Sequence, residues 1–506
     1  MIWPWRKSDA APDPLRDEIA KLRLEKVRLQ RSAVRARRKV MLGVHRAAEQ
    51  NRLTNDWLAP ATSGDSEILA DIPRVNARAR QVIRDDPYAR SIVRSFKRNI
   101  VGTGITPSLD GRPYEAAWKA WARDKHLVDR EGRRNFVAIQ RWCVSELVAA
   151  GEAFVVRWIM AREGLRPPRL MLQCFEFEQL DRYKLEERTT GNEVRGGIEV
   201  DEHGRPVAYH FYRRHPNDVR GLARPAPLML ESFRVPARYV SHFYDPDRVR
   251  QTRGISRLAP VLRKIRDLSE YDATQLQVAR AEASIGLLIK STAMDEAGDA
   301  TEPLQLDGLN VAYLAEGEDV TPFTPTRPGR EYEPFTKSQL RAIAAGVGIS
   351  YEQLARDLSQ TTYSGGRQGS IDDHREWQPL GGMLAEDVCQ PVLDDWTYVW
   401  ATNNPAESGD YFLTEDSKPV VWQGQGWDWV DPEAQGAAVE RKMRLGLTSR
   451  TRELNLLGTS VAEIDRERGS DGTAEIVKAL GKADGREVPA PARPETTQLP
   501  EVAHAG

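Results

Sequence analysis

The sequence is poor in cysteine and has no surplus of either charge. Its 506 residues include three cysteines, Cys143, Cys174 and Cys389, which lie far apart and form no Cys-x-x-Cys pair. Such spacing provides no disulfide framework and suits a reducing compartment. Lysine and arginine total 73 against 74 aspartates and glutamates. The chain therefore lacks the basic excess expected of a protein that reads a DNA sequence.

Long apolar runs are also missing. The longest are a few residues, as in the segment from Ile285 to Ile289, and none approaches the length needed to span a bilayer. The N-terminal stretch MIWPWRKSDAAPDPL has prolines and charges where an export signal needs an apolar segment. We therefore expect a soluble protein that is made inside the cell and has no membrane partner.

The chain lacks the common nucleotide-binding and catalytic motifs. GGRQGS has no lysine and follows a predicted helix, so it does not match a P-loop. VGTGI lacks the third glycine of a dinucleotide fingerprint, and Pro107 follows it where a helix is required. Neither HExxH nor GxSxG occurs. The sequence therefore predicts no enzyme, no cofactor and no metal site.

Histidines and paired acidic residues occur, but their positions favour structural roles. His210, His215 and His242 lie near predicted strands, where a satisfied structural histidine is expected. The acidic doublets lie at helix starts or on polar helix faces, where they can cap a helix or be solvated. These doublets are Asp85–Asp86, Asp372–Asp373 and Asp394–Asp395.

The first fifty residues are basic, with thirteen lysines and arginines against six acidic residues. The segment 15–48 has the pattern of a charged helix with loosely periodic apolar positions. This arm is either a solvated helix or an arm that meets nucleic acid or an acidic partner. The sequence leaves both interpretations open.

Residues 70–250 alternate helix and strand patterns and predict a mixed α+β domain. Asp86 can cap a helix that starts with Pro87 and ends in the glycines of VGTGI. Tryptophan-rich helical segments follow, and a helix ends at Gly151. Four stretches have the composition of strands. They are AFVVRWIM, LMLQCFEF, VAYHFY and RYVSHFY.

The central part of the chain predicts two helices on either side of a hairpin. Residues 258–290 predict one helix of about 30 residues, roughly 45 Å long. Asn310–Leu314 and Val320–Thr324 predict the two strands of a hairpin, and Thr336–Val347 predicts the second helix. After a short helix and the loop 357–370, a long helix is expected over 371–400, interrupted near Pro379.

The loop DLSQTTYSGGRQGS, residues 357–370, is polar and punctuated by glycines. Because it is no phosphate cradle, it is either a plain solvent-exposed connector or a mobile segment that touches something moving past it. The residue pattern alone does not separate these two interpretations.

The C-terminal part predicts short helices. Asp431, Pro432 and Glu433 are typical of a helix start, and further helices are expected over 449–457, 461–468 and 472–480. WQGQGWDWVD before them is either a stacking platform for bases or a packed aromatic junction. The junction is favoured because no basic residue is interleaved with Trp422, Trp427 and Trp429. The proline-rich residues 481–506 should be disordered.

Several of these segments together resemble the phage lambda-type family of tailed-phage portal proteins. The resemblance is carried by IPRVNARARQVIRDDPYARSIVRSFKRNIVGTGI, by RGISRLAPVLRKIRDLSEYDATQLQVARAEAS, by EGEDVTPFTPTRPGREYEPFTKSQLRAIAAGVGISYEQLARDLSQTTYSGGR, and by WDWVDPEAQ followed by GLTSRTRE. It extends from about residue 70 to about residue 470. The family often has Tyr-Ser-Ser where this chain has Tyr363–Ser364–Gly365.

The resemblance implies an α+β, mainly helical portal-type fold assembled as a ring. It divides the chain into a basic N-terminal arm (1–69), a wing (70–256), a first stem helix (257–290), a clip with a β-hairpin (291–334), a second stem helix region (335–356), a tunnel loop (357–370), a return to the wing (371–430), a helical crown (431–480) and a disordered tail (481–506).

The same resemblance implies a channel at one capsid vertex, in the virion and, during assembly, in the host cytoplasm. Implied partners are further copies in a dodecameric ring, the terminase large subunit, head–tail adaptors, major capsid and scaffold proteins, and double-stranded DNA bound without sequence specificity. The loop residues expected to meet DNA are Ser359, Gln360, Thr361, Thr362, Tyr363, Ser364, Gly365, Gly366, Arg367 and Gln368. The clip residues expected to dock partners are Glu316, Glu318, Asp319, Arg327 and Arg330.

Two other functions stay open from the sequence. One is a nucleic-acid-processing enzyme with an unrecognised site, and the other is a different head–tail structural protein such as an adaptor. The chain length and the helix–hairpin–helix segment 258–347 argue against an adaptor.

Overall fold

The structure is a computed structural model that describes ten segments of the chain and a few single residues. These are residues 61–109, 111–162, 165–218, 231–284, 287–291, 318–322, 331–408, 420–427, 431–459 and 461–472, with residues 25, 26, 28, 52, 329 and 475. Chain contacts divide the protein into residues 1–62 and 63–506, and the fold below belongs to the second unit. Most of the predicted arm, the tail 481–506 and nearly all of the predicted helix 472–480 lie outside the described residues.

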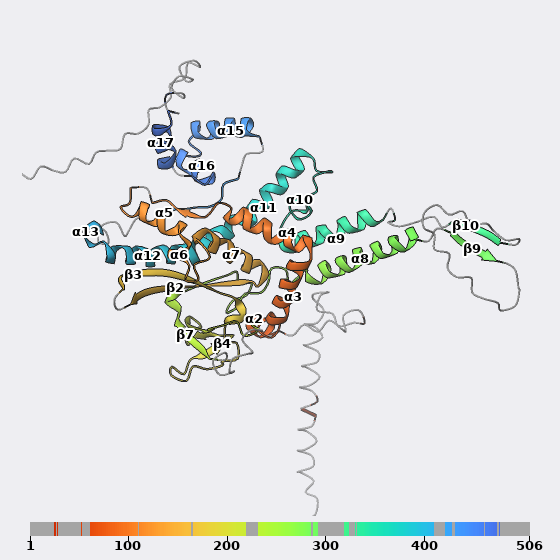
Figure 1. Ribbon diagram of the computed structural model, residues 1–506, viewed down its shortest axis with the longest axis horizontal. Coiled ribbons are helices and arrows are strands. Elements are labelled where there is room, and N and C mark those ends of the chain that lie inside the picture. The colour runs from red at the N-terminus through yellow and green to blue at the C-terminus, as the bar shows by residue number, and fades with distance from the viewer. Residues whose placement is uncertain are drawn as a thin grey trace, which may run out of the picture. The chain divides into compact units, whose positions relative to one another are not determined.

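The described part is mainly helical with small antiparallel sheets, which is the predicted α+β class (Figure 1). Its first helices are α2 (Gly64–Ile68), α3 (Ile72–Asp85), α4 (Pro87–Phe96), α5 (Glu115–Arg123), α6 (Lys125–Val128) and α7 (Phe136–Ala149). The Asp86 carboxylate accepts a hydrogen bond from the Ala89 N–H at 2.8 Å, so the predicted cap of α4 is confirmed. A π-helical turn, η2 (Lys97–Val101), extends α4 as far as Gly102.

Two antiparallel sheets follow α7. In the first, β2 (Glu152–Arg162) lies between β3 (Leu165–Phe175) and β8 (Val240–Tyr244). The second has the order β4 (Glu193–Arg195), β5 (Ile198–Val200), β6 (Pro206–Tyr212) and β7 (Ser232–Pro236). Buried aromatic side chains from both sheets form one apolar cluster that contains Phe154, Phe175 and Phe211. The four predicted strands correspond to β2, β3, β6 and β8. The short 3-10 turns η3 (Phe177–Gln179) and η6 (Ala237–Tyr239) connect strands.

The end of α7 crosses the chain segment that leads to α8 at direct backbone contact. Gly151 has φ of +84°, and a Cβ placed on it would lie 2.1 Å from the carbonyl carbon of Ile255. A Cβ on Gly254 would likewise lie 2.1 Å from the Gly151 carbonyl oxygen. Only glycine fits both the backbone angle and the space at Gly151. This crossing connects the sheets to the central helices.

Helix α8 (Leu262–Ser284) packs alongside α9 (Tyr332–Val347) (Figure 1). The Tyr332 hydroxyl donates to the Asp272 carboxylate at 3.0 Å, and the rings of Tyr271 and Phe335 lie 5.1 Å apart. The predicted second helix is therefore confirmed, beginning four residues earlier than Thr336.

The prediction of a single helix over 258–290 is wrong at its end. Residues Leu287–Ser291 form strand β9, which pairs antiparallel with β10 (Glu318–Pro322). The apolar, partly β-branched run around Ile289 favours a strand over a continued helix. The predicted strand 320–324 overlaps β10, but the described partner is β9, while the predicted partner 310–314 lies outside the described residues.

The chain continues through α10 (Tyr351–Ala355), α11 (Tyr363–Leu384) and α12 (Gln390–Asn403). The expected break near Pro379 is wrong, because α11 runs through that proline. The irregularity falls later, in the π-helical turn η7 (Ala385–Cys389), just before Pro391 in the first turn of α12. A π turn absorbs the extra residue without ending the helix.

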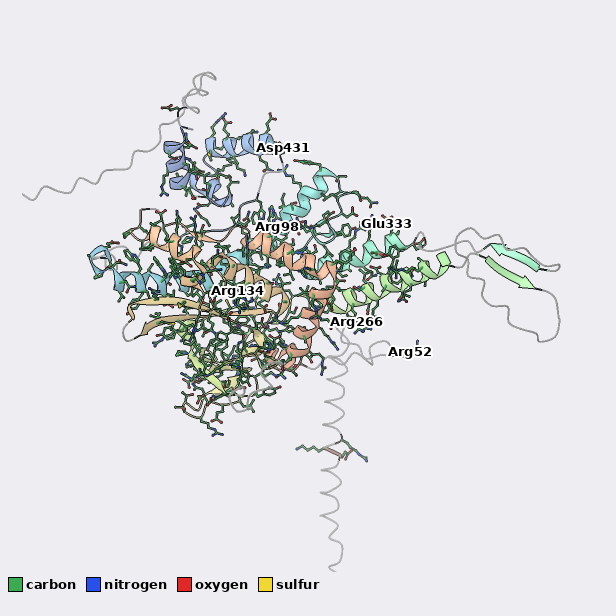
Figure 2. The ribbon with its side chains drawn as sticks, viewed as in Figure 1. Arg52, Arg98, Arg134, Arg266, Glu333 and Asp431 are labelled. Carbon is green, nitrogen blue, oxygen red and sulfur yellow. The ribbon has the colours of Figure 1, made fainter. Side chains whose placement is uncertain are left out.

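The C-terminal elements agree largely with the sequence. They are α13 (Pro405–Ser408), β11 (Trp422–Gln423), which pairs with β1 (Thr106–Pro107), and helices α15 (Pro432–Arg444), α16 (Arg450–Leu456) and α17 (Val461–Ser470). The Asp431 carboxylate caps α15 by accepting a hydrogen bond from the Ala434 N–H at 3.0 Å, and Asp431 is labelled in Figure 2. Trp422 and Trp427 pack against the main core, which confirms the packed aromatic junction for these two residues.

Two further expectations concern the thiols and the membrane. Cys143, Cys174 and Cys389 are free, and burial raises the pKa of all three thiols. All three are therefore inert: Cys143 and Cys389 lie in the core, and the partly buried Cys174 packs against it. Among the described residues, no helix combines the length and apolar character required to cross a bilayer.

We predict that Gly151→Ala lowers the free energy of unfolding by about 3 kcal/mol or more, because the methyl group would overlap the Ile255 backbone in a left-handed conformation. The control is Gly382→Ala in α11, where the added Cβ has no atom within 4 Å. Alanine should be neutral or slightly stabilising there. Thermal and urea unfolding of both variants measures this, and equal midpoints would contradict it.

Candidate functional site

The segment predicted as a mobile loop lies between α10 and α11. Helix α10 ends at Arg356, whose φ of +55° is unusual for a residue other than glycine. Residues 357–362 then form the connection, and α11 begins at Tyr363. The irregular segment is therefore about half as long as the sequence indicated.

Side chains at the beginning of this connection hold it to α10. The Asp357 carboxylate accepts hydrogen bonds from the Ser359 N–H at 3.0 Å, from the Ser359 hydroxyl at 2.6 Å and from the Tyr351 hydroxyl at 3.1 Å. The bonds from Ser359 are the largest reason why the pKa of Asp357 lies below its usual value. Thr361 donates to Glu352 at 3.2 Å. The connection is therefore tethered at both ends, which the glycines had not suggested.

The prediction of loop over 363–370 is wrong, because these residues form the first two turns of α11. The Thr362 hydroxyl accepts a hydrogen bond from the Gly365 N–H at 3.2 Å and caps the helix. A threonine cap can offset part of the unfavourable helix propensity of Gly365, Gly366 and Gly369. The loop and the helix start together present exposed side chains that include Leu358, 69% exposed, and Tyr363, 58% exposed.

The predicted loop residues lie next to one another, but some belong to a connection and the others to a helix. Ser359, Gln360, Thr361 and Thr362 lie in the connection, and Tyr363 to Gln368 lie at the N-terminus of α11, where Arg367 is exposed. The N-terminal end of a helix carries a partial positive charge that favours anions. This arrangement offers neutral hydroxyls, one cation and a helix N-terminus on one short stretch.

Asp373 fixes the orientation of α11, a role that the sequence did not predict. Its carboxylate is buried and accepts hydrogen bonds at 2.7 Å from both the N–H and the hydroxyl of Ser350, the cap residue of α10. Burial raises the pKa of Asp373 in spite of these bonds. The expected solvated doublet is therefore wrong for Asp373, and also for Asp395, which pairs with Arg157 at 2.7 Å.

Of the predicted clip residues, only Glu318 and Asp319 lie within the described part of the chain. Both are on β10, opposite Ser291 and Lys290 of β9. Glu316, Arg327 and Arg330 lie outside the described residues.

A basic cavity near α4 was missed by the sequence analysis. Arg94, Lys97, Arg98 and Arg141 line a space of about 460 Å³ between α4, η2 and α7. The signal that could have found it is the recurrence of Arg90, Arg94 and Arg98 every fourth residue, on the side of α4 opposite its apolar residues.

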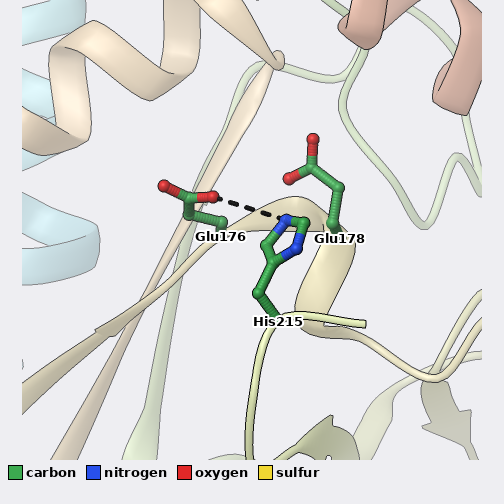
Figure 3. A group of neighbouring side chains, drawn as sticks. All are labelled: Glu176, Glu178 and His215. Carbon is green, nitrogen blue, oxygen red and sulfur yellow. Dashed lines mark ion pairs between the residues drawn. The ribbon is translucent and has the colours of Figure 1, made fainter. Parts of the chain in front are cut away.

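Two groups of carboxylates and histidine have the composition of a metal site. In the first, Figure 3 shows His215 between Glu176 and Glu178, with the His215 Nε2 to Glu176 Oε2 distance at 3.8 Å. Arg80 already donates to both oxygens of Glu178 at 3.1 Å. The His215 Nδ1 atom accepts from the Asn217 N–H at 3.2 Å. These contacts describe an ion-pair network around Arg80.

The second group consists of Glu187, Glu199 and His210, all of which are buried. Lys184 lies 2.6 Å from Glu187, and Arg234 lies 2.7 Å from Glu199, so both carboxylates have cationic partners. The expectation of a satisfied structural histidine holds for only one ring nitrogen of the buried His210. Its Nδ1 atom lies 3.4 Å from Lys184 Nζ, whereas its Nε2 atom has no hydrogen-bond partner and lies 3.5 Å from Glu199. Burial lowers the pKa of His210, which favours the neutral ring.

Comparison with known proteins connects this architecture to one family. Residues 50–380 match the family model described as phage portal protein, lambda family, and this match covers more than half of the chain. The chain belongs to the lambda family of phage portal proteins. A portal protein is a structural component of the phage virion and serves as a connector of the capsid.

Named portal proteins are similar over most of their length. The probable portal protein of Halomonas phage phiHAP-1 is 27% identical over 453 residues, which cover 84% of this chain and 83% of that protein. Portal protein B of Escherichia phage lambda is 27% identical over 360 residues, 62% of this chain and 66% of that protein. The portal protein of Escherichia phage N15 is 26% identical over 391 residues, with 67% and 71% covered.

Solved structures of gene transfer agent particles show a weaker likeness. A chain from the neck of an empty particle has a TM-score of 0.44 and 13% identity, covering 76% of this chain and 92% of that chain. A chain from the virion of the native particle has a TM-score of 0.41 and 11% identity, with 78% and 98% covered.

We predict that Glu199→Gln destabilises the portal fold by about 1 to 2 kcal/mol at neutral pH, because the buried carboxylate loses its charge-assisted hydrogen bond from Arg234, whose 37% exposed side chain is partly screened by water. Burial raises the pKa of Glu199, but hydrogen bonds from Arg234, Asn192 and Thr190 together lower it to about 2 from a usual value of 4.5. The charged carboxylate therefore stabilises the fold above pH 4.5, and this contribution is lost as the pH falls toward 2.

The difference in urea midpoint between wild type and Glu199→Gln should accordingly shrink as the pH is lowered through this range. Glu202→Gln is the matched control, since the Glu202 side chain is 84% exposed. A difference that stays constant with pH, or an equal loss in the control, would argue against this role of Glu199.

Proposed function

We propose that the chain forms a closed ring of twelve subunits at one vertex of the capsid. Double-stranded DNA enters through this ring, driven by the terminase, and later leaves through it. The subunits assemble in the host cytoplasm and remain in the virion. The ring itself performs no catalytic step, and this sets it apart from the alternative of a nucleic-acid-processing enzyme.

The observation that carries the proposal is the pair of helices α8 and α9 in a member of the portal family. The two helices contact each other through Tyr332 and Asp272 and through the rings of Tyr271 and Phe335, and a Cβ on Gly346 of α9 would lie 2.5 Å from the side chain of Val261, the residue just before α8. Beyond Leu268, however, the described side chains of α8 are partly or fully exposed. Leu276 is 53% exposed and Phe335 on α9 is 44% exposed. Apolar side chains of this kind, exposed in one subunit, can be buried against a second copy.

The same helices support a conduit in which DNA slides. Helix α9 leads through α10 to the tethered loop and to the N-terminus of α11, which we assign to the channel wall. Hydroxyls such as those of Thr362 and Ser364 offer neutral, weak hydrogen bonds to phosphate oxygens. Arg367 adds one positive charge per subunit. Weak contacts repeated around a ring hold a duplex without stopping its movement, since every phosphate contact adds salt-dependent affinity.

The strand pair β9–β10 and the segments beside it serve, in this proposal, as the docking surface for partners. Terminase would bind there during packaging, and head–tail adaptors would bind there afterwards. Glu316, Glu318, Asp319, Arg327 and Arg330 are the proposed docking residues. Major capsid and scaffold proteins would contact the outer parts of the ring.

Leu276→Asp tests the ring, because a carboxylate buried between subunits without a partner is costly. We expect native mass spectrometry to show a closed ring for the wild type and free or incomplete subunits for this variant, with unchanged circular dichroism. The control is Leu185→Asp, since Leu185 is 76% exposed outside the helix pair and should still assemble. A wild-type chain that stays monomeric at every concentration, or a Leu276→Asp variant that assembles normally, would refute the proposal.

Arg367→Glu tests the channel assignment. The exposed side chain loses no described core contact, so rings should form normally, while twelve repelling charges should reduce DNA-filled heads by about tenfold. Counting filled heads and measuring the length of packaged DNA gives the result. Arg188→Glu provides the same charge change at an exposed position in the sheet region. Normal filling by Arg367→Glu would mean that the α11 start does not meet DNA.

A further inference from the structure

The basic cavity at the end of α4 has no role in the proposed channel loop. It has a volume of about 460 Å³, and helix α4, the turn η2, helix α7 and the segment 420–427 contribute its walls. Its lining consists of Arg94, Lys97, Arg98, Gly102, Thr103, Arg141 and Gln425. Four of these seven residues are cations, and none is acidic.

Two of the cavity's cations, Arg94 on α4 and Arg98 on its extension η2, continue a regular pattern that begins at Arg90. Arg90, Arg94 and Arg98 are exposed at every fourth position, while Ile92 and Phe96 on the opposite face are fully buried. Residues four apart lie on one face of a helix, about 6 Å apart along its axis. Figure 2 shows Arg98 near the end of α4. Arg141 approaches from α7 and adds a further guanidinium.

These charges are not neutralised within the described part of the chain. No ion pair there joins Arg94, Lys97, Arg98 or Arg141 to a carboxylate. The preceding helix α3 differs, because Arg80 binds Glu146 at 2.8 Å and Arg84 binds Asp85 at 2.9 Å. Cations that converge on one cavity without a carboxylate to neutralise them favour an anionic ligand.

The backbone holds the cavity in shape. Gly102 has φ of +49°, a backbone angle that favours glycine, and a Cβ there would lie 1.7 Å from the Gln425 side-chain oxygen, so a larger residue would also displace Gln425. The Gly102 carbonyl accepts a hydrogen bond from Arg141 Nε at 2.9 Å, and the Thr103 N–H donates to Gln425 Oε1 at 3.0 Å. The π-helical turn η2 lies at the same place, and such turns are frequent at functional sites.

The lining also indicates which anion fits. It contains no aromatic side chain on which a base could stack and no large apolar side chain that could anchor a protein partner. Guanidinium groups match the geometry of phosphate through paired hydrogen bonds. We propose that this cavity binds backbone phosphates of double-stranded DNA.

The identity of the DNA rests on the proposed portal channel, whereas the cavity itself belongs to a single subunit. Arg98 donates a hydrogen bond to Gln353 of α10 at 3.1 Å, and α10 leads directly to the loop before α11. The cavity therefore adjoins the elements assigned to the channel. Phosphates held here would supply affinity that the nearly neutral loop lacks.

The test compares two double variants of the full chain. Arg94→Gln with Arg98→Gln removes two cations from the cavity, and Arg74→Gln with Arg78→Gln removes two exposed cations at the same spacing on α3. Binding of a short fluorescein-labelled duplex is followed by anisotropy over a range of salt concentrations. The cavity variant should bind the duplex about tenfold more weakly near 0.1 M salt. The slope of log K against log salt concentration should be smaller in magnitude by about 1 to 2. The α3 variant should bind like the wild type.

Other outcomes overturn the proposal. Equal losses in both variants would mean that only total charge matters. A loss of polyglutamate binding by the cavity variant, with DNA binding unchanged, would assign the cavity to an acidic protein segment. Dissociation of the assembly in the cavity variant, with DNA binding by free subunits intact, would make it an interface between copies. A wild-type chain that forms no ring would contradict the portal channel alone, because the binding assay can still be read on monomers.

Discussion

The fold depends on one backbone crossing, where Gly151 meets Gly254 without room for a side chain. The neighbouring Glu152 and Arg253 form a fully buried ion pair at 2.5 Å, and Glu152 also accepts from the Gly254 N–H at 2.9 Å. Burial alone would raise the pKa of Glu152, but Arg253 and His242 lower it below its usual value. A buried charge pair of this kind is costly unless every partner is in place, so it fixes one geometry for the crossing.

The central helices inherit their position from this crossing. The Ser256 hydroxyl donates to the Val148 carbonyl at 3.0 Å, only a few residues before α8 begins. Asp272 of α8 holds α9 through the Tyr332 hydroxyl, and α9 leads through α10 to α11. Asp373 of α11 in turn binds Ser350, the cap residue of α10. A path of hydrogen-bonded elements thus runs from the sheets to the segment that we assign to the channel. Side chains that bind weakly and are held in place by packed helices suit a conduit for DNA better than a binding site for one ligand.

Sequence reasoning predicted the elements whose signals are local. Asp86 before Pro87 and Asp431 before Pro432 gave correct helix starts, and runs of apolar, β-branched and aromatic residues gave the strands around Phe154 and Phe211. Sequence reasoning failed where contacts with another part of the chain determine the secondary structure. The glycines after Thr362 looked like a loop, but the cap and the bond from Ser350 to Asp373 keep them helical. The run before Ser291 looked helical, but it pairs with β10. The arginines that recur through Arg94 and Arg98 signal a basic face, but not that Arg141 of α7 completes a cavity beside it.

A three-dimensional reconstruction of the purified assembly by electron cryomicroscopy tests the central claim most directly. The account predicts a closed ring in which α8 and α9 of adjacent subunits touch through the face that carries Leu276. It also predicts that residues from Ser359 to Arg367 of every subunit face the axial channel. A reconstruction in which the start of α11 points away from the axis, or in which the helix pair faces solvent on every side, would contradict it.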